Sequence, residues 1–278
     1  MLGEPDRWSK GASQSRDVLL FCTLGPLRID LNADVGEAFG AYAIGHDAGL
    51  LKWVTSASVA AGFHAGDPSV LRDTIRAAKS HGVAVGAHPG FPDLVGFGRR
   101  EMTVTPKEAE DFVLYQIAAV AGVAAAEGVR LQHVKPHGAL FNMAAKDAVL
   151  ATAIARATAA AGPSLILFGL PGSEILKAGR AAGLRVAAEA FADRAYEADG
   201  SLVSREKPGA VIHGAEVVAR AIRMAKDSVV TAIDGTLVTL EVDTIGVHSD
   251  TPGADDLAAR LRAGLEAAGV TVKAIGAA

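Results

Sequence analysis

The stretch RIDLNADVGE, residues 28–37, joins a short strand-like run to a turn that carries acids where a dinucleotide-binding fold would carry glycines. A doubly wound fold of that kind places a Gly-x-Gly-x-x-Gly turn directly after its first strand. Here the turn LNADVGE has a single glycine and two acids, and the sequence contains no Gly-x-x-x-x-Gly-Lys phosphate loop. The first turn therefore argues against an open nucleotide-binding sheet.

Beyond this turn, short β-branched runs alternate with longer stretches of helical spacing. Strands are predicted at 28–32, 56–63, 83–88, 131–135, 164–170, 184–190 and 236–248, and helices at 45–54, 68–81, 106–127, 146–161, 172–182, 210–226 and 254–268. Asp67-Pro68 and Thr105-Pro106 are typical helix starts, and glycines after residues 81, 127 and 182 are typical helix ends. Seven strand–helix repeats indicate parallel strands joined by right-handed crossovers. We predict a single-domain, seven-stranded β/α (TIM-like) barrel over residues 28–278.

Composition narrows the class of protein. Half of the 278 residues are hydrophobic and 21% are charged, which is typical of a globular protein with a sizeable core. The net charge of −4 argues against a nucleic-acid surface. The single cysteine, Cys22, excludes an internal disulfide and favours the cytoplasm.

The first 27 residues differ from the rest. They begin polar and without a period, which predicts a disordered extension. The apolar run VLLFCTLGPL resembles a signal-peptide core, but no small-x-small cleavage site follows it and it is too short to span a bilayer. We therefore expect no membrane association.

Ionisable residues gather where the predicted strands end. In a β/α barrel these ends form one rim, which carries the active site. Six of the seven strands supply such residues: Asp30, Asn32, Asp34 and Glu37; His64 and Asp67; His88 and Asp93; Lys135 and His137; Glu189, Asp193 and Arg194; His248 and Asp250. Any one of these has a structural alternative, and Asp67 is better explained as a helix cap. Their convergence at one end of the barrel indicates a catalytic rim.

The segment HVKPHG, residues 133–138, is the densest part of this rim. Residues 133, 135 and 137 share one face in extended geometry, and Pro136 favours the extended conformation for Lys135. Lys135 could stabilise an oxyanion or phosphate, and His137 could act as an acid or base near neutral pH. We expect His133 to support the site from behind, and His46, His81 and His213 to lie on the surface.

Two chemistries fit such a rim. No Gly-x-Ser-x-Gly elbow is present and Cys22 precedes the barrel, so a serine or cysteine acyl-enzyme is disfavoured. One possibility is metal-assisted hydrolysis, in which an Asp and two His hold a divalent ion. The other is acid/base hydrolysis by carboxylates and histidines with lysine and arginine assisting.

Six segments in order resemble the LamB/YcsF family, which is the 5-oxoprolinase A-chain family. They are IDLNADVGE, AGFHAGDP, GAHPGFPD, QHVKPHGALFN, FADRAYEADGSLVSR and VHSD, and the resemblance spans residues 28–274. Three positions depart from the family pattern: Ala61 stands for a frequent cysteine, Gly90 for a serine, and Ser249 for a glycine.

The resemblance implies a barrel of the glycoside hydrolase/deacetylase type. It also implies the ATP-dependent opening of 5-oxoproline to glutamate together with subunits B and C, with Mg²⁺ accompanying the nucleotide. The implied catalytic residues are Asp34, His64, Lys135, His137 and Asp193. Those implied to bind substrate or phosphate are Asn32, Glu37, His88, Glu189, Arg194, His248 and Asp250.

Within this scheme, Asp34, His64 or His137 is expected to position the attacking water. Lys135 and Arg194 are expected to counter the charge of a phosphorylated amide oxygen. A stand-alone metal-dependent deacetylase or amidohydrolase, with Asp34, His64 and His88 as ligands, is the first alternative. A non-catalytic scaffold that activates its partner subunits is the second.

Overall fold

A computed structural model describes residues 27–250 and 252–276. Seven parallel strands form the centre: β1 (Arg28–Val35), β2 (Ser56–Ala60), β3 (Ala84–His88), β4 (Leu131–Val134), β5 (Ile166–Gly169), β6 (Arg185–Ala190) and β9 (Thr244–His248). They pair in this order, and β1 pairs with β9 as well as with β2, so the sheet closes on itself. The predicted seven-stranded β/α barrel is therefore confirmed. The extension expected at residues 1–27 and Cys22 lie, apart from Leu27, outside the described residues.

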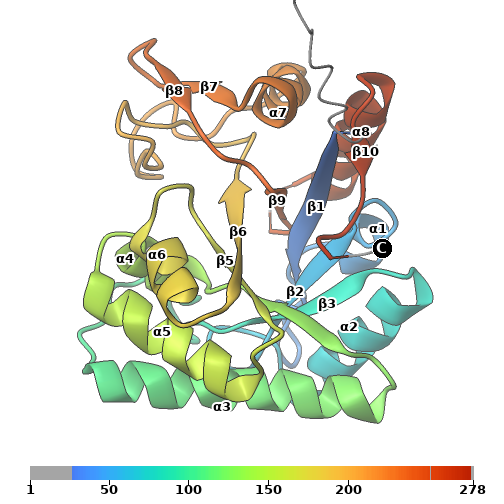
Figure 1. Ribbon diagram of the computed structural model, residues 1–278. Coiled ribbons are helices and arrows are strands. Elements are labelled where there is room, and N and C mark those ends of the chain that lie inside the picture. The colour runs from blue at the N-terminus through green and yellow to red at the C-terminus, as the bar shows by residue number, and fades with distance from the viewer. Residues whose placement is uncertain (1–26, 251, 277–278) are drawn as a thin grey trace, which may run out of the picture.

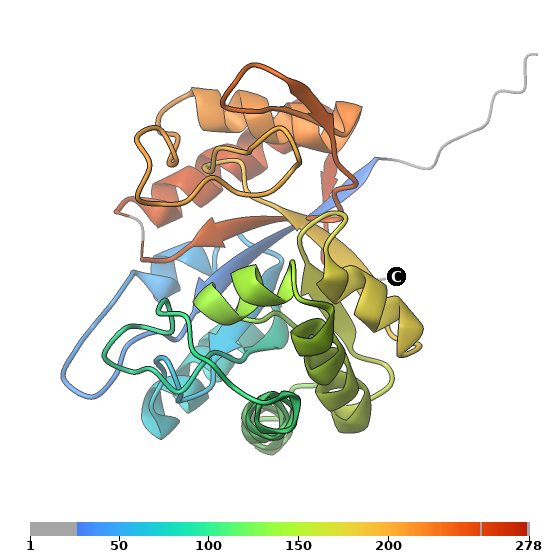
Figure 2. The same cartoon turned by 90° about the vertical axis from the view of Figure 1, so that its left-hand side faces the viewer.

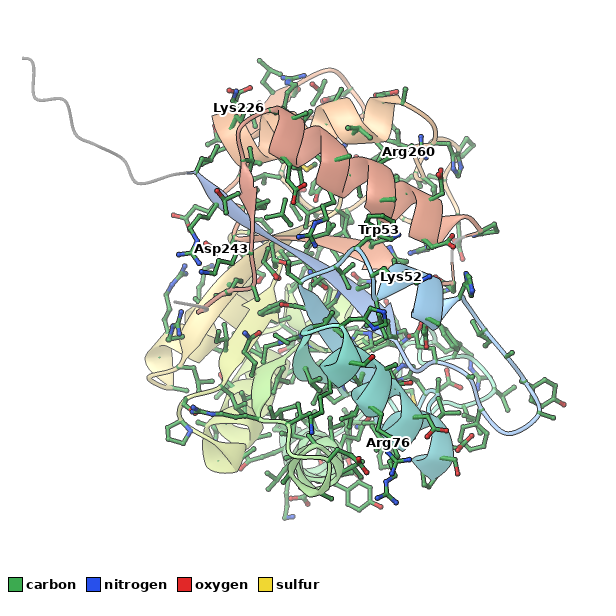
Figure 3. The ribbon with its side chains drawn as sticks, turned by 90° about the vertical axis from the view of Figure 1, so that its right-hand side faces the viewer. Lys52, Trp53, Arg76, Lys226, Asp243 and Arg260 are labelled. Carbon is green, nitrogen blue, oxygen red and sulfur yellow. The ribbon has the colours of Figure 1, made fainter. Side chains whose placement is uncertain are left out.

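Helices surround the barrel (Figure 1). They are α1 (Asp47–Leu50), α2 (Pro68–Ser80), α3 (Pro106–Ala126), α4 (Gly138–Ala144), α5 (Ala148–Ala161), α6 (Glu174–Ala181), α7 (Glu216–Asp227) and α8 (Ala254–Ala267). The predicted starts at Asp67 and Thr105 and the glycine ends at 82, 128 and 183 are confirmed. Figure 3 shows Lys52 and Trp53 between α8, which carries Arg260, and α2, which carries Arg76.

Helix α3 illustrates how the outer layer forms. Thr105 and Glu108 make a reciprocal capping box at its start, with Pro106 as the first helical residue. Its buried side chains, among them Val113, Ile117 and Val120, recur at helical spacing and pack into the core. The helix is long and apolar enough to cross a membrane by length and composition alone. Its buried face packs against the strands and α5.

The last predicted strand, 236–248, is wrong as one element. Leu237–Thr239 forms β8, which pairs antiparallel with β7 (Val229–Thr231) in a separate hairpin, and only Thr244–His248 enters the barrel. The hairpin turn contains Asp234-Gly235, a strong local signal for such a turn. Asp243 then fixes the entry to the barrel, because its carboxylate accepts a hydrogen bond from the Ala188 amide at 2.8 Å.

Three further elements differ from expectation. The helix expected at 210–226 begins only at Glu216, and α4 directly after HVKPH is a helix that the sequence pattern did not predict. The short strand β10 (Thr271–Val272) pairs with the start of β1. Ile275 follows it and packs against Ile166 and Phe168 at the end where the barrel strands begin.

Candidate functional site

A cavity of about 930 Å³ opens where the barrel strands end. Eight of the predicted site residues line it: Asp34, Glu37, His88, Lys135, His137, Arg194, His248 and Asp250. The other four, Asn32, His64, Glu189 and Asp193, are buried directly behind this lining. The loops after β1 and β3 project on the same side of the barrel (Figure 2). The structure thus brings the predicted rim together.

Lys135 is the central cation of the site. Its ammonium lies 2.8 Å from Asp34 Oδ1 and donates hydrogen bonds to Glu189 Oε1 at 2.6 Å and Asn32 Oδ1 at 3.0 Å. The Asn32 amide in turn donates to Glu189 at 2.9 Å and to Thr244 at 2.8 Å. Three strands are therefore tied together beneath the cavity floor.

This network holds charged groups in a buried environment. Burial opposes the charged form of Lys135, but the Asp34 and Glu189 carboxylates outweigh it and raise the lysine pKa above its ordinary value. Burial likewise opposes ionisation of Asp34, yet His88 and Lys135 hold its pKa well below the usual range. Burial dominates at Glu189 and raises its pKa. An ammonium–carboxylate pair consequently faces the cavity at neutral pH.

Beside this pair lies a cluster of histidines around Glu37. The side chains of Glu37, His64, His88 and His137 each offer one ligand atom, and these atoms lie within 4.8 Å of one another. The His64 and His137 rings stack in parallel with centroids 3.8 Å apart, whereas His88 meets His137 edge-on. Asp34, which was predicted as a metal ligand with His64 and His88, lies outside this group and contacts His88 at 3.4 Å.

Burial sets the protonation of the cluster. It holds the pKa of His64 and of His137 well below the ordinary value, with the neighbouring histidines adding to the effect. Burial raises the pKa of Glu37 well above its usual range, and the charges of Asp34 and Asp250 raise it further. The two cavity-facing carboxyl groups of β1 and its loop thus have pKa values displaced in opposite directions.

The loop after β3 positions this cluster. Gln116 on α3 makes two hydrogen bonds to Gly90. It accepts one from the Gly90 amide and donates one to the Gly90 carbonyl, each at 2.9 Å. Asp93 accepts from the Gly96 amide at 2.9 Å and from Arg100, closing the loop on itself. Phe97 has a positive φ of 54°, a costly conformation for a bulky residue, and its carbonyl accepts a hydrogen bond from His137.

The opposite wall comes from the segments after β6 and β9. His248 lies 3.5 Å from Asp193 and stacks on Phe191. Burial opposes ionisation of Asp193, but the contact with His248 and the charges of Arg194 and Arg205 together lower its pKa. Asp250 pairs with Arg99 at 2.6 Å, which joins this wall to the loop after β3. Arg194 donates to the carbonyls of Val203 and Ala210 while lining the cavity.

Two residues of the predicted rim, Asp30 and Asp67, have other roles, and His133 lies behind the rim. Asp30 lies one layer lower in the barrel, where Thr55, Ser56 and Thr244 donate to its carboxylate. Asp67 caps α2, as expected. His133, expected behind the site, is fully buried against Phe168.

Several residues of the site carry no prediction from sequence. Arg99, Glu101, Lys146 and Arg205 line the cavity. Gln116 lies within an apolar helix pattern, where a lone polar residue on the buried face is the signal that could have revealed it. Phe97 carried no local signal, because its strained backbone is imposed by contacts across the loop.

Comparisons with known proteins identify the family of the chain. The sequence profile of the LamB/YcsF family matches residues 29–278. The chain belongs to the LamB/YcsF family. It is 57% identical over 248 residues to the A subunit of 5-oxoprolinase from Chloroflexus aggregans, covering 89% of this chain and 98% of that protein. The protein of the same name from Bacillus subtilis is 52% identical over 249 residues, covering 89% of this chain and 97% of the relative.

Solved structures support the family and the fold. A "lactam utilization protein" from Thermus thermophilus superposes with a TM-score of 0.85 at 49% identity, covering 89% of this chain and all of that one. A putative cellobiose-phosphate cleavage protein from Enterococcus faecalis has a TM-score of 0.56 at 14% identity, covering 89% of this chain and 97% of the other. At that identity the likeness shows the barrel fold alone.

Proposed function

We propose that this chain is the A subunit of a multi-subunit 5-oxoprolinase, which opens 5-oxoproline to L-glutamate with ATP hydrolysis together with subunits B and C. The observation that carries the proposal is the 52–57% identity, over nearly their whole length, to relatives that are named as the A subunit of 5-oxoprolinase. The name "lactam utilization protein" of the Thermus relative is consistent with a cyclic amide substrate.

The cavity offers the groups that opening a lactam requires. A five-membered lactam resists hydrolysis because its amide is resonance-stabilised, so the reaction needs an activated carbonyl and a positioned water. Asp34 and His137 line the cavity and can orient that water, whereas His64 is shielded behind them. Lys135, held cationic between Asp34 and Glu189, can stabilise negative charge that develops on the carbonyl oxygen.

A nucleotide would find suitable partners on the outer wall of the cavity. Lys146, Arg194 and Arg205 line that wall, and clustered cations of this kind favour a polyphosphate. The buried Ser173 hydroxyl also lines it and has no hydrogen-bond partner. When bound, ATP with its Mg²⁺ supplies the phosphoryl group that activates the amide oxygen. Arg194 and Lys135 would counter the resulting charge.

The test is glutamate release from 5-oxoproline by purified protein, with and without ATP and with and without co-expressed subunits B and C. We expect release only when ATP and both partners are present. Replacing His137 by Ala should lower the rate by about 100-fold or more, the usual scale for losing an acid–base group. His213→Ala, an exposed histidine, is the matched control. Absence of glutamate release by the complete wild-type complex would refute the proposal.

The group formed by Glu37, His64, His88 and His137 favours one other candidate function. A metal-dependent amidohydrolase or deacetylase acting alone would use the same cavity. Hydrolysis of a small amide or an acetylated sugar by the isolated chain, without ATP but with added Zn²⁺, would support this second candidate over the first.

A further inference from the structure

Two backbone carbonyls fix the proton positions of His88 and His137. His88 Nδ1 lies 2.7 Å from the carbonyl oxygen of Lys135, and His137 Nε2 lies 2.8 Å from that of Phe97. A carbonyl oxygen can only accept, so each of these ring nitrogens must carry the proton and donate it. The other nitrogen of each ring, His88 Nε2 and His137 Nδ1, is not engaged by a carbonyl.

These two nitrogens face each other at 3.0 Å. Glu37 Oε1 lies 3.4 Å from His137 Nδ1 and 4.0 Å from His88 Nε2. Two ring nitrogens and one carboxylate oxygen therefore converge on one point in a buried region. A shared proton can join the two rings, whereas one cation at this focus can bind all three atoms.

We infer that Glu37, His88 and His137 form a binding site for one divalent transition-metal cation of the Zn²⁺ type. Ligand atoms around tetrahedral zinc lie about 3.3 Å apart, given metal–ligand bonds of about 2.0–2.1 Å. The three separations of 3.0, 3.4 and 4.0 Å bracket that value. Two nitrogens and one carboxylate favour this class of ion over Mg²⁺, which prefers oxygen ligands in octahedral geometry.

The surroundings are those of an oriented metal site. Metal-binding histidines usually donate their second ring N–H to a carbonyl or carboxylate, as both His88 and His137 do here. His64 is assigned a supporting role. Its ring lies parallel to that of His137, so the two rings cannot both point at the same ion, and its Nε2 approaches Glu37 Oε1 at 3.3 Å.

The inference extends the proposed function, because a cation at this site would lie next to Asp34 and Lys135 at the reacting carbonyl. Its test does not depend on activity. The protein is stripped with EDTA, dialysed, and titrated with Zn²⁺ alone by calorimetry. A parallel titration with Co²⁺ reads the visible absorption band of a low-coordinate site. We expect about one equivalent bound and a Co²⁺ band typical of mixed nitrogen and oxygen ligands.

Variants separate this site from unspecific binding. Glu37→Gln, which keeps the side-chain shape, and His88→Ala should each weaken Zn²⁺ binding by about 100-fold or more, since even supporting residues of metal sites are worth 10- to 100-fold. His248→Gln, a histidine of the same cavity outside the focus, should bind within about twofold of wild type. Circular dichroism and thermal melting check that each variant is folded.

Two results would overturn the inference. One is a folded wild type that binds no Zn²⁺ or Co²⁺, which would mean that a shared proton occupies the focus. The other is a site that Mg²⁺ fills equally well at equal concentration. Glutamate release by the metal-free complex would leave the proposed function standing, while metal binding without glutamate release would leave the metal site standing.

Discussion

At the scale of single residues, Lys135 shows how one buried cation supports both the fold and the site. It is 3% exposed and pairs with two carboxylates that belong to different strands. Such buried ion pairs add little stability compared with apolar packing. Removing one partner, however, leaves the remaining charges buried without a counter-charge. Lys135 therefore contributes both to the stability of the fold and to the chemistry of the site.

Replacing Lys135 by Met should lower the free energy of unfolding by about 3–5 kcal/mol, because Asp34 and Glu189 would lose their partner. Urea denaturation measures the change. Lys107→Met is the control, since Lys107 pairs with Asp111 on the surface and such exposed pairs contribute little to stability. Equal effects of the two changes would show that the buried pairs do not matter.

His133 should make stability depend on pH. Burial lowers its pKa to about 3, with the Lys135 charge adding to the effect, and Ser58 and Gln132 hydrogen-bond the ring. The unfolded chain takes up this proton near pH 6.5, so stability is complete above that pH and falls as the pH drops toward 3.

Between pH 7 and pH 4.5 the loss due to His133 alone should be about 3 kcal/mol, at about 1.4 kcal/mol per pH unit below 6.5. Urea denaturation at both pH values measures this loss. The unfolding free energy of His133→Gln should fall between the two pH values by that much less than the unfolding free energy of the wild type. The exposed His81→Gln should match wild type. An unchanged pH dependence in the buried variant would contradict the assignment.

At the scale of elements, α3 and the loop after β3 act as one unit. Gln116 is fully buried, and its amide group satisfies both backbone groups of Gly90. The same loop contains Phe97, whose carbonyl accepts a hydrogen bond from His137. Helix α3, on the outside of the barrel, therefore helps to orient the histidine cluster through this loop.

Gln116→Met should cost about 2–4 kcal/mol of stability, because two buried backbone groups would each lose a partner worth about 1–2 kcal/mol. It should also speed hydrogen exchange of the Gly90 amide, while the Ala109 amide at the start of α3 serves as the internal reference. Unchanged hydrogen exchange at Gly90 would show that the Gln116 hydrogen bonds are not needed to hold the loop in place.

At the scale of the whole molecule, the two ends of the barrel have different tasks. The cavity occupies the end where strands finish, and Ile275 with Ile166 and Phe168 packs at the end where they begin. The Ile275 carbonyl also accepts a hydrogen bond from Gln132 at 2.9 Å. Stability and chemistry are thus separated along the barrel axis.

Ile275→Asp should lower the free energy of unfolding by about 2 kcal/mol, since it places a charge against an apolar cluster. Ile233→Asp, at a residue that is 50% exposed, should change it by less than about 0.5 kcal/mol. Neither change should alter the activity proposed for the cavity. A loss of activity at full stability in Ile275→Asp would show that the two ends are coupled.

The barrel could be predicted from local patterns alone, namely the alternation of strands and helices and the glycine-poor first turn. The sequence also determined which rim residues exist, since strand ends carry their side chains to one edge wherever parallel strands close. It failed at 236–248, where the Asp234-Gly235 turn and Asp243 divide one apolar run between two sheets.

Only the tertiary structure decided how the rim residues divide their tasks. Asp34 pairs with Lys135 while Glu37 joins the histidines, although both acids lie on the same short segment of sequence. The carbonyls that fix His88 and His137 belong to Lys135 and Phe97, the second of them 40 residues from its histidine. Hydrogen-bond direction and burial depend on contacts between distant segments, and no local pattern encodes them.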